Sequence, residues 1–255
     1  MKTVKDTAKL YVFAKASEKR YNYHIMNIMK KDRLSEEKIT EILDILKREY
    51  PDAGCALVHR NVFELIVCVV LSAQTTDVSV NGVSRELFDR YPDAESLASA
   101  SAEDVIEIIK TIGMYRTKSK NIIALAKELT EKHGGKVPQD YDALVALPGV
   151  GRKTANVVLA VGFGQQRIAV DTHVFRVSRR IGLAPSGKDE SAKAAGAAEV
   201  LATEKELMRN LPEDRWSEAH HSLIWHGRKC CTARNPKCDS CTISHLCIKN
   251  RELLH

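Results

Sequence analysis

The fold is constrained most by a nine-residue run in the middle of the chain, Leu147-Pro148-Gly149-Val150-Gly151-Arg152-Lys153-Thr154-Ala155. Pro148 is expected to end a short helix over 141–147, because the residue before a proline is pushed out of the α region. Gly149 and Gly151 permit a tight turn and leave backbone amides uncovered. An apolar helix is expected over about 152–161. The run therefore predicts two short helices joined by a glycine hairpin, with free amides at the start of the second helix.

The start of that second helix suits an anion such as a DNA phosphate, because its free amides and the helix dipole carry partial positive charge. Lys153 places an amine on the same turn. Asp171 precedes apolar residues at helical spacing and is expected to cap a helix. A carboxylate held in this way can also accept a proton or stabilise positive charge on a sugar. A lone Gly-x-Gly is usually a packing corner, but the full run with its lysine favours DNA binding and lesion chemistry.

A second pattern lies near the C-terminus, where four cysteines fall within residues 231–247: Cys231, Cys238, Cys241 and Cys247. Only seven cysteines occur in 255 residues and no secretory segment is visible, so reduced thiols are favoured over disulfides. Four thiolates suit a tetrahedral zinc ion or an iron–sulfur cluster, and the spacing alone does not decide between them. Cys230 is an adjacent fifth thiol. The nearby histidines are interpreted as packing or surface residues and not as ligands: His220, His221 and His226.

Together with the run Leu71–Asn81, these patterns closely resemble the endonuclease III family of helix-hairpin-helix DNA glycosylase/AP lyases. The resemblance covers residues 34–249. It implies that Lys153 is the nucleophile, that Asp171 is its essential partner, and that the four cysteines bind a [4Fe-4S] cluster. It also implies that Gln74 enters the gap left by a flipped base and that Met114 wedges the opposite strand. The hairpin residues expected to contact DNA are Leu147, Gly149, Gly151 and Arg152.

The same resemblance implies an all-α fold in which two helical domains flank a DNA-binding cleft. Residues 55–165 would form a six-helix domain that contains the helix-hairpin-helix, 141–161. Residues 34–54 and 166–255 would form a discontinuous domain that carries the iron–sulfur cluster loop, 231–247. Helix caps and apolar spacing point independently to helices, with no competing strand pattern. The expected caps besides Asp171 are Ser35, Asn61 and Ser101.

The net positive charge is concentrated at the N-terminus. Residues 1–33 hold nine Lys/Arg and three Asp/Glu, and the resulting +6 equals the net charge of the whole chain. We interpret this segment as a mobile basic N-terminal extension that strengthens non-specific DNA binding. In the remainder, a DNA-binding face must come from segregated charge. The candidates beside Met114 are Arg116, Lys118 and Lys120.

The expected function is a bifunctional DNA glycosylase/AP lyase of base excision repair. It would excise oxidised pyrimidines from double-stranded DNA and nick 3′ to the abasic site by β-elimination through a lysine Schiff base. We expect the protein to be a monomer. We also expect no membrane binding, since the longest apolar run, Leu65–Leu71, is too short to span a membrane. It would act in the cytoplasm at the bacterial nucleoid, or in an organelle or the nucleus of a eukaryote.

Two alternatives stay open. A monofunctional mismatch glycosylase of the same superfamily would share the hairpin and the cluster, but such enzymes carry a different residue at the position of Lys153. A non-catalytic DNA-binding module stabilised by a metal would also use the hairpin. Phosphate binding by itself requires neither Lys153 nor Asp171, and this pair argues against the second alternative.

Overall fold

The computed structural model describes residues 34–184 and 196–253. Over these residues the chain forms twelve α-helices, two short 3-10 turns and no strand, so the all-α prediction is confirmed. The expected basic extension, residues 1–33, lies outside the described residues. The helices are α2 (Glu36–Glu49), α3 (Val62–Leu71), α4 (Asp77–Arg90), α5 (Ala94–Ala98), α6 (Ala102–Ile109), α7 (Tyr115–His133), α8 (Tyr141–Ala146), α9 (Arg152–Phe163), α10 (Thr172–Ile181), α11 (Ala197–Asn210), α12 (Trp216–Lys229) and α13 (Ile248–Leu253).

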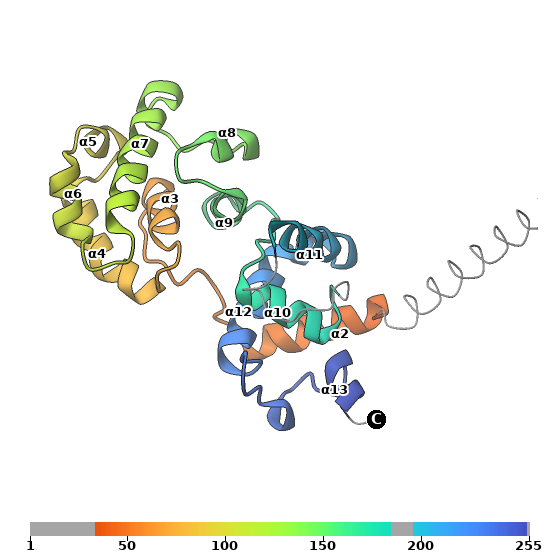
Figure 1. The fold of residues 1–255 in the computed structure, drawn as a ribbon. Helices are drawn as coiled ribbons and strands as arrows, with labels where there is room; N and C mark the ends of the chain where they lie inside the picture. Colours follow the sequence, from red (N-terminus) through yellow and green to blue (C-terminus); the bar gives the residue numbers. More distant parts are fainter. Residues whose placement is uncertain (1–33, 185–195, 254–255) are drawn as a thin grey trace, which may run out of the picture.

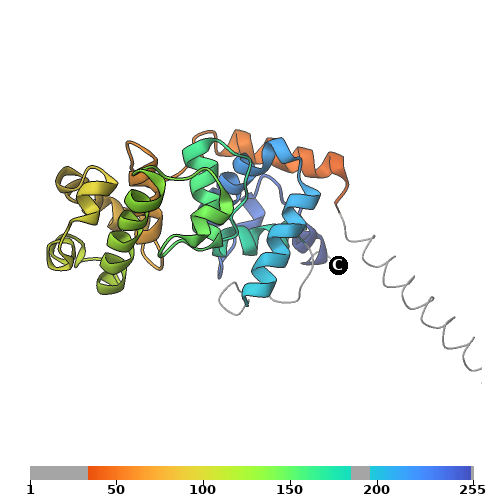
Figure 2. The same cartoon turned by 90° about the horizontal axis from the view of Figure 1, so that it is seen from above.

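The helices are arranged in two lobes that lie side by side (Figures 1 and 2). The first lobe comprises α3 to α9, and its buried apolar residues all come from the stretch 57–159. The second lobe comprises α2 and α10 to α13, and its buried apolar residues come from two stretches, 34–50 and 168–246. The domain boundaries expected near 54/55 and 165/166 fall between these two sets of residues.

Local capping explains where several helices begin. The side chain of Asn61 accepts a hydrogen bond from Glu64 N at 2.9 Å, and that of Ser101 accepts one from Asp104 N at 3.1 Å. Ser35 caps α2 in the same way. Each of these bonds satisfies an amide that has no partner within its own helix. The caps expected from the sequence at these three positions are confirmed.

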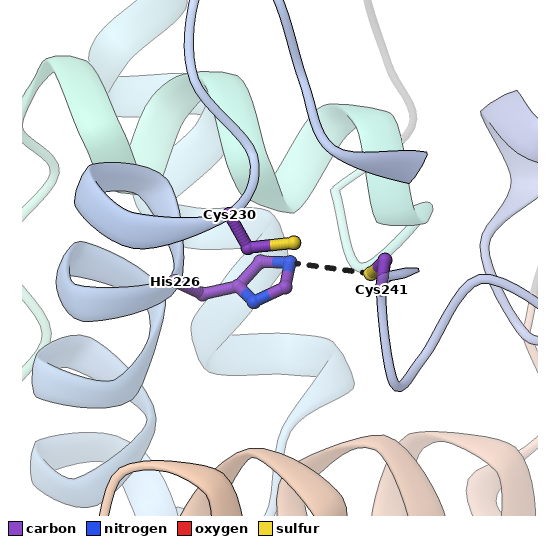
Figure 3. Close-up of side chains that lie close together, drawn as sticks. All are labelled: His226, Cys230 and Cys241. Atoms are coloured by element: carbon purple, nitrogen blue, oxygen red, sulfur yellow. Dashed lines mark hydrogen bonds between the residues drawn. The ribbon is translucent and has the colours of Figure 1, made fainter. Parts of the chain in front are cut away.

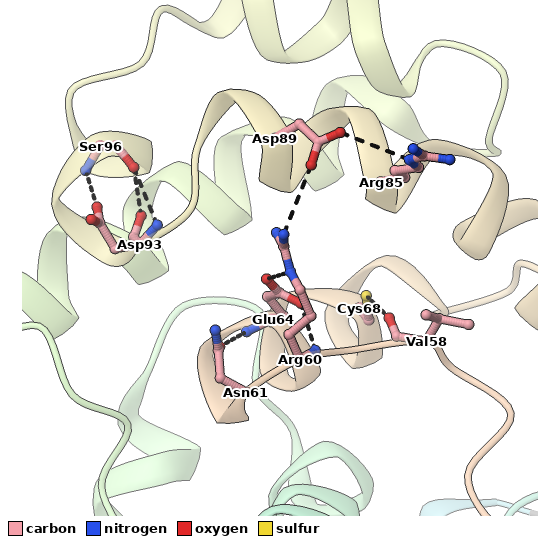
Figure 4. A network of polar contacts seen from close by, with 9 residues as sticks. All are labelled: Val58, Arg60, Asn61, Glu64, Cys68, Arg85, Asp89, Asp93 and Ser96. Carbon is pink, nitrogen blue, oxygen red and sulfur yellow. Dashed lines mark hydrogen bonds and ion pairs between the residues drawn. The ribbon is translucent and has the colours of Figure 1, made fainter.

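A polar network fixes the start of α3 against the end of α4 (Figure 4). Glu64 is buried, and its carboxylate accepts hydrogen bonds from the backbone N and the Nε of Arg60, both at 2.7 Å. The same guanidinium lies 3.8 Å from Asp89, which also pairs with Arg85. The buried carboxylate is thus charge-paired, which removes most of the cost of burying it.

Helix α9 packs closely against α3. A Cβ on Gly162 would lie only 2.9 Å from Val62 Cγ1, so glycine permits this approach. Ala155, Val158 and Leu159 on the same helix are completely buried in the first lobe. This packing sets the position of the glycine hairpin, which immediately precedes α9.

Among the described residues, two ion pairs join the lobes. Arg152 on α9 contacts Glu204 on α11, and Arg228 on α12 contacts Asp77 at the start of α4 at 2.8 Å. Asp77 and Arg228 of the second pair also line the inter-lobe pocket described below. In the parts of the chain that the structure describes, no helix combines the length and apolar character needed to cross a membrane.

Candidate active site and metal centre

The predicted glycine hairpin is present between α8 and α9. Gly149 has φ +76°, a left-handed conformation that strongly favours glycine. A Cβ there would also lie 3.1 Å from Asn121 Cβ. The turn is closed by a hydrogen bond from Val150 N to Leu147 O at 3.1 Å. Leu147 and Val150 are buried and anchor the hairpin in the first lobe, and contact between Leu147 and DNA stays a prediction.

The N-terminus of α9 carries no side-chain cap, because its N-cap residue is Gly151. The amides of the first turn therefore have no capping partner, which is the arrangement that suits an anion. Lys153 lies on this turn and is exposed. The structure thus places an accessible amine beside uncapped amides, as the sequence predicts.

Arg152, the neighbour of Lys153, makes inter-lobe contacts. Its Nε lies 3.0 and 3.1 Å from the two carboxylate oxygens of Glu204, whose side chain is only 4% exposed. Its Nη1 donates to Tyr141 Oη at 3.2 Å. About half of the Arg152 side chain is still exposed. Contact between Arg152 and DNA stays a prediction. The ion pair with Glu204 is a structural role that the sequence did not predict.

Asp171 caps α10, as expected. Its Oδ1 accepts hydrogen bonds from His173 N at 2.8 Å and from Val174 N at 2.7 Å. Both bonds go to the same oxygen, so Oδ2 receives neither of them. The cap therefore fixes the direction of the carboxylate while leaving an oxygen for chemistry.

Lys153 and Asp171 line the same pocket between the lobes, although they come from α9 of the first lobe and the start of α10 in the second. The pocket is open and has a volume of about 770 Å³. Residues of both lobes form its wall. Besides Lys153 and Asp171, the pocket is lined by Gly54, Cys55, Ala56, Leu57, Val69, Ser72, Ala73, Asp77, Thr154, Val157, His220, His221, Ile224 and Arg228. The resemblance-based expectation that the lysine and the aspartate face a cleft between the domains agrees with this arrangement.

The histidine pair of α12 belongs to this pocket, which the sequence did not reveal. The rings of His220 and His221 contact edge to face, with centroids 4.9 Å apart. Burial, and then the neighbouring His221, lowers the pKa of His220 to about 3, so its ring is neutral at physiological pH. His220 Nδ1 is buried and has no hydrogen-bond partner among the residues that the structure describes.

Gln74 and Met114, the residues expected to enter the DNA, share an unusual backbone. Among the described residues they are the two non-glycine residues with positive φ, at 53° and 58°. This conformation costs about 1–2 kcal/mol per residue. Gln74 is exposed. Met114 is 54% exposed and belongs to the few large apolar residues that are exposed in the described part of the chain. Both turns therefore present their side chains to solvent at an energetic cost, which is typical of functional positions.

One candidate for the basic face is wrong. Lys118 is only 3% exposed, and its Nζ donates to Thr75 Oγ1 in the turn that carries Gln74. Burial lowers the pKa of this lysine. Lys118 thus supports the Gln74 turn from behind, whereas Arg116 and Lys120 are exposed.

The predicted metal-binding cysteines come together in the second lobe. They line a pocket of about 330 Å³, and Cys230 lines it as well. Two buried arginines of α10 hold the beginning of the loop: Arg176 donates to Cys231 O at 3.1 Å, and Arg180 donates to Thr232 O at 2.7 Å. Cys247 Sγ lies 3.2 Å from Arg180 O on the other side. Segments far apart in the sequence thus enclose one thiol-lined cavity.

The donor set fits an iron–sulfur cluster. A four-iron cluster takes one thiolate at each iron, so its ligands surround a cage and do not converge on one point. Within the described residues, the donors that converge within 4.8 Å belong to a different set, His226, Cys230 and Cys241. Burial raises the pKa of the Cys241 thiol to about 12 and also raises that of Cys247. Bound iron would supply the positive charge that stabilises their thiolates.

Comparison with known families agrees with both parts of this site. A family model described as the HhH-GPD superfamily base excision DNA repair protein matches residues 67–201. A second model, the iron-sulfur binding domain of endonuclease III, matches residues 231–247. Endonuclease III of Bacillus subtilis is 48% identical over 219 residues, which span 86% of this chain and 95% of that protein. Endonuclease III of Escherichia coli K12 is 44% identical over 214 residues, 84% of this chain and 96% of that protein.

Solved structures give the same result. A trapped endonuclease III–DNA covalent intermediate superposes with a TM-score of 0.76 and 44% identity, covering 87% of this chain and all of that one. A non-covalent endonuclease III–DNA complex gives the same TM-score and identity, covering 87% of this chain and 99% of that one. A thermostable thymine-DNA glycosylase shares the fold, with a TM-score of 0.72 at 22% identity over 85% of this chain and 98% of that one.

Proposed function

Since the chain belongs to the endonuclease III family, the DNA glycosylase/AP lyases of base excision repair, we propose that Lys153 is its nucleophile and that oxidised pyrimidines in duplex DNA are its substrates. The observation that carries the proposal is the pocket shared by Lys153 and Asp171. An amine and a carboxylate from different lobes meet where a base rotated out of the helix would enter. Unstacking costs less for a damaged base, which is one source of selectivity.

The chemistry follows from these two side chains. Lys153 Nζ attacks C1′ of the deoxyribose as the bond from C1′ to the base breaks and the base departs. Asp171, whose direction is fixed by its two bonds to α10 amides, accepts the amine proton or stabilises positive charge on the sugar. The resulting Schiff base acidifies the C2′ proton, and its loss drives β-elimination of the 3′ phosphate. The iron–sulfur cluster, a [4Fe-4S] centre on Cys231, Cys238, Cys241 and Cys247, supplies structural support for the second lobe.

The DNA contacts are assigned to three surfaces. The uncapped amides of α9 after Gly149 and Gly151 bind a backbone phosphate. Gln74 fills the gap left by the extruded base, and Met114 wedges the opposite strand, both from strained turns. We assign the activity to a monomer, and both proposed catalytic side chains come from a single chain. Its place of work is where chromosomal DNA lies, the cytoplasm of a bacterium or the nucleus or an organelle of a eukaryote.

Borohydride trapping tests the proposal. The duplex carries a single thymine glycol, and reduction converts the Schiff base into a covalent protein–DNA adduct that is visible on a denaturing gel. The wild-type chain is expected to give the adduct. Lys153→Ala and Lys153→Arg are expected to give none, the second while keeping the positive charge needed for DNA affinity. Lys38→Ala, which removes an exposed lysine of α2 outside both the pocket and the expected basic face, should trap normally.

The outcomes separate the alternatives. An adduct that survives in both Lys153 variants would refute the assignment of the nucleophile. Release of thymine from a G·T mismatch without any trapping would indicate a monofunctional mismatch glycosylase. Tight duplex binding with neither base release nor trapping would indicate a DNA-binding module.

A further inference from the structure

Three donor atoms converge in the second lobe, and two of them lie outside the expected cluster set (Figure 3). His226, Cys230 and Cys241 each offer a ligand atom, and these atoms lie within 4.8 Å of one another. His226 and Cys230 are one helical turn apart at the end of α12, and Cys241 lies in the loop that follows. Only Cys241 is shared with the four cysteines assigned to the iron–sulfur cluster.

The imidazole of this group is oriented as a ligand would be. His226 is 2% exposed, its Nδ1 lies 3.1 Å from Tyr50 Oη, and its Nε2 lies 3.7 Å from Cys241 Sγ. Metal-binding histidines characteristically hold one ring nitrogen on an outer partner so that the other faces the ion. Tyr50 follows α2, 176 residues away in sequence, and serves as that outer partner.

Cys230 and Cys231 have different surroundings although they are neighbours in sequence. Cys230 Sγ lies 3.7 Å from Lys237 O and belongs to the converging group. Cys231 Sγ lies 3.6 Å from Nη1 of Arg180 on α10. The two thiols are therefore suited to different tasks.

We propose that His226, Cys230 and Cys241 form a second metal site, which takes a single thiophilic divalent cation such as Zn²⁺ when the iron–sulfur cluster is absent. Two thiolates and one imidazole are ordinary zinc ligands, and water completes the tetrahedron. Binding releases one proton from each thiol. Because Cys241 belongs to both sets, zinc and the cluster exclude each other. The site thus holds the unfilled loop in a metal-bound state that blocks cluster assembly.

The test compares Cys230→Ala with Cys231→Ala in the full chain. Each is produced in iron-replete medium and in iron-depleted medium supplemented with zinc, and metal per chain is measured. Cys230→Ala should keep its iron but lower the affinity for zinc more than about tenfold, since loss of a ligand exceeds the usual effect of losing an outer partner. Cys231→Ala should show the reverse, losing iron while keeping zinc. A competing chelating dye gives the zinc affinity.

X-ray absorption of the zinc-loaded wild-type chain gives a second readout that needs no variant. We expect a mixed shell with one nitrogen donor near 2.0–2.1 Å and sulfur donors near 2.3 Å. An all-sulfur shell, unchanged zinc affinity in Cys230→Ala, equal loss of zinc in both variants, or no zinc in the wild type would each overturn the proposal. Circular dichroism of both variants verifies that the helices are intact.

Discussion

The first lobe and the second lobe bury different kinds of side chain. The interior of the first lobe comes from one continuous stretch, 57–159, and holds five of the fourteen buried polar side chains that the structure describes. The second lobe is assembled from two stretches and contains nine of the fourteen buried polar side chains that the structure describes. Arg176 and Arg180 donate to carbonyls of the cysteine loop, and Glu204 pairs with Arg152 across the lobe boundary. The first lobe is therefore stabilised mainly by apolar burial, and the second by specific polar contacts and a metal centre.

Removal of the iron–sulfur cluster should give the largest effect, and it should destabilise the second lobe while leaving the first lobe intact. Cys247→Ala deletes one proposed cluster ligand in the second lobe. Bound structural metal contributes folding free energy directly, here on the order of 10 kcal/mol by analogy with structural zinc. In hydrogen exchange we expect α2, α10 and α12 to lose protection while α3 and α7 keep theirs. Cys55→Ala in the first lobe is the matched control and should leave the second lobe unchanged. Equal loss of protection in both lobes would contradict the distinction.

The next largest effect is expected at the boundary. Arg152→Ala leaves the buried Glu204 carboxylate without its cation, and breaking a buried pair in this way costs about 3 kcal/mol. Denaturant unfolding measures the loss. Adding Glu204→Gln to Arg152→Ala removes the stranded charge and should restore most of the stability. If the double variant is no more stable than Arg152→Ala alone, the buried charge is not the cause.

Acid should weaken the second lobe through His220. Burial lowers the pKa of His220 to about 3 in the folded chain, whereas the unfolded chain titrates near 6.5. Between these values the unfolded chain binds a proton that the folded chain does not. Stability therefore falls as pH is lowered through this window, by at most about 1.4 kcal/mol per pH unit for this one group. His220→Gln should flatten the dependence of the unfolding free energy on pH, and an unchanged slope would exclude His220 as its source.

The smallest effect is expected in the hairpin of the first lobe. Gly149→Ala forces a Cβ into a left-handed backbone and against Asn121 and Val70, at a cost of about 1 kcal/mol. Gly151→Ala is the control, because a Cβ there meets nothing within 4 Å and its φ is −95°. Thermal unfolding should separate the two variants. If both are equally stable, the turn relaxes without cost.

Features set by neighbouring residues were predictable from the sequence. Asn61, Ser101 and Asp171 cap helices as expected, because each accepts from an amide two or three residues ahead. The cap of α4 by Thr76 was not predicted, although its hydroxyl accepts from Ser79 N in the same way. Helix α5 was missed, since its five residues are too few to show a period.

Contacts between distant segments were not predictable. Lys118 reaches Thr75 across 43 residues and is buried for that reason, although its place in a basic run indicated an exposed face. Tyr50 and His226 are 176 residues apart in sequence, so their contact is seen only in the folded structure. The same holds for the orientation of the His226 ring toward the proposed metal site. The roles proposed for Lys153 and Asp171 rest on local motifs, so they could be inferred from the sequence alone.

The discontinuous origin of the second lobe has a consequence for synthesis. Helix α2 leaves the ribosome first among the described helices. Its apolar face consists of Ile39, Ile42, Leu43 and Leu46, and this face packs against residues that are translated only after position 168. The first lobe can complete its core while this face has no partner. The nascent chain thus passes through an interval with one finished lobe and one exposed apolar helix. Apolar surface exposed in this way promotes aggregation, so rapid completion of the second lobe protects the nascent chain.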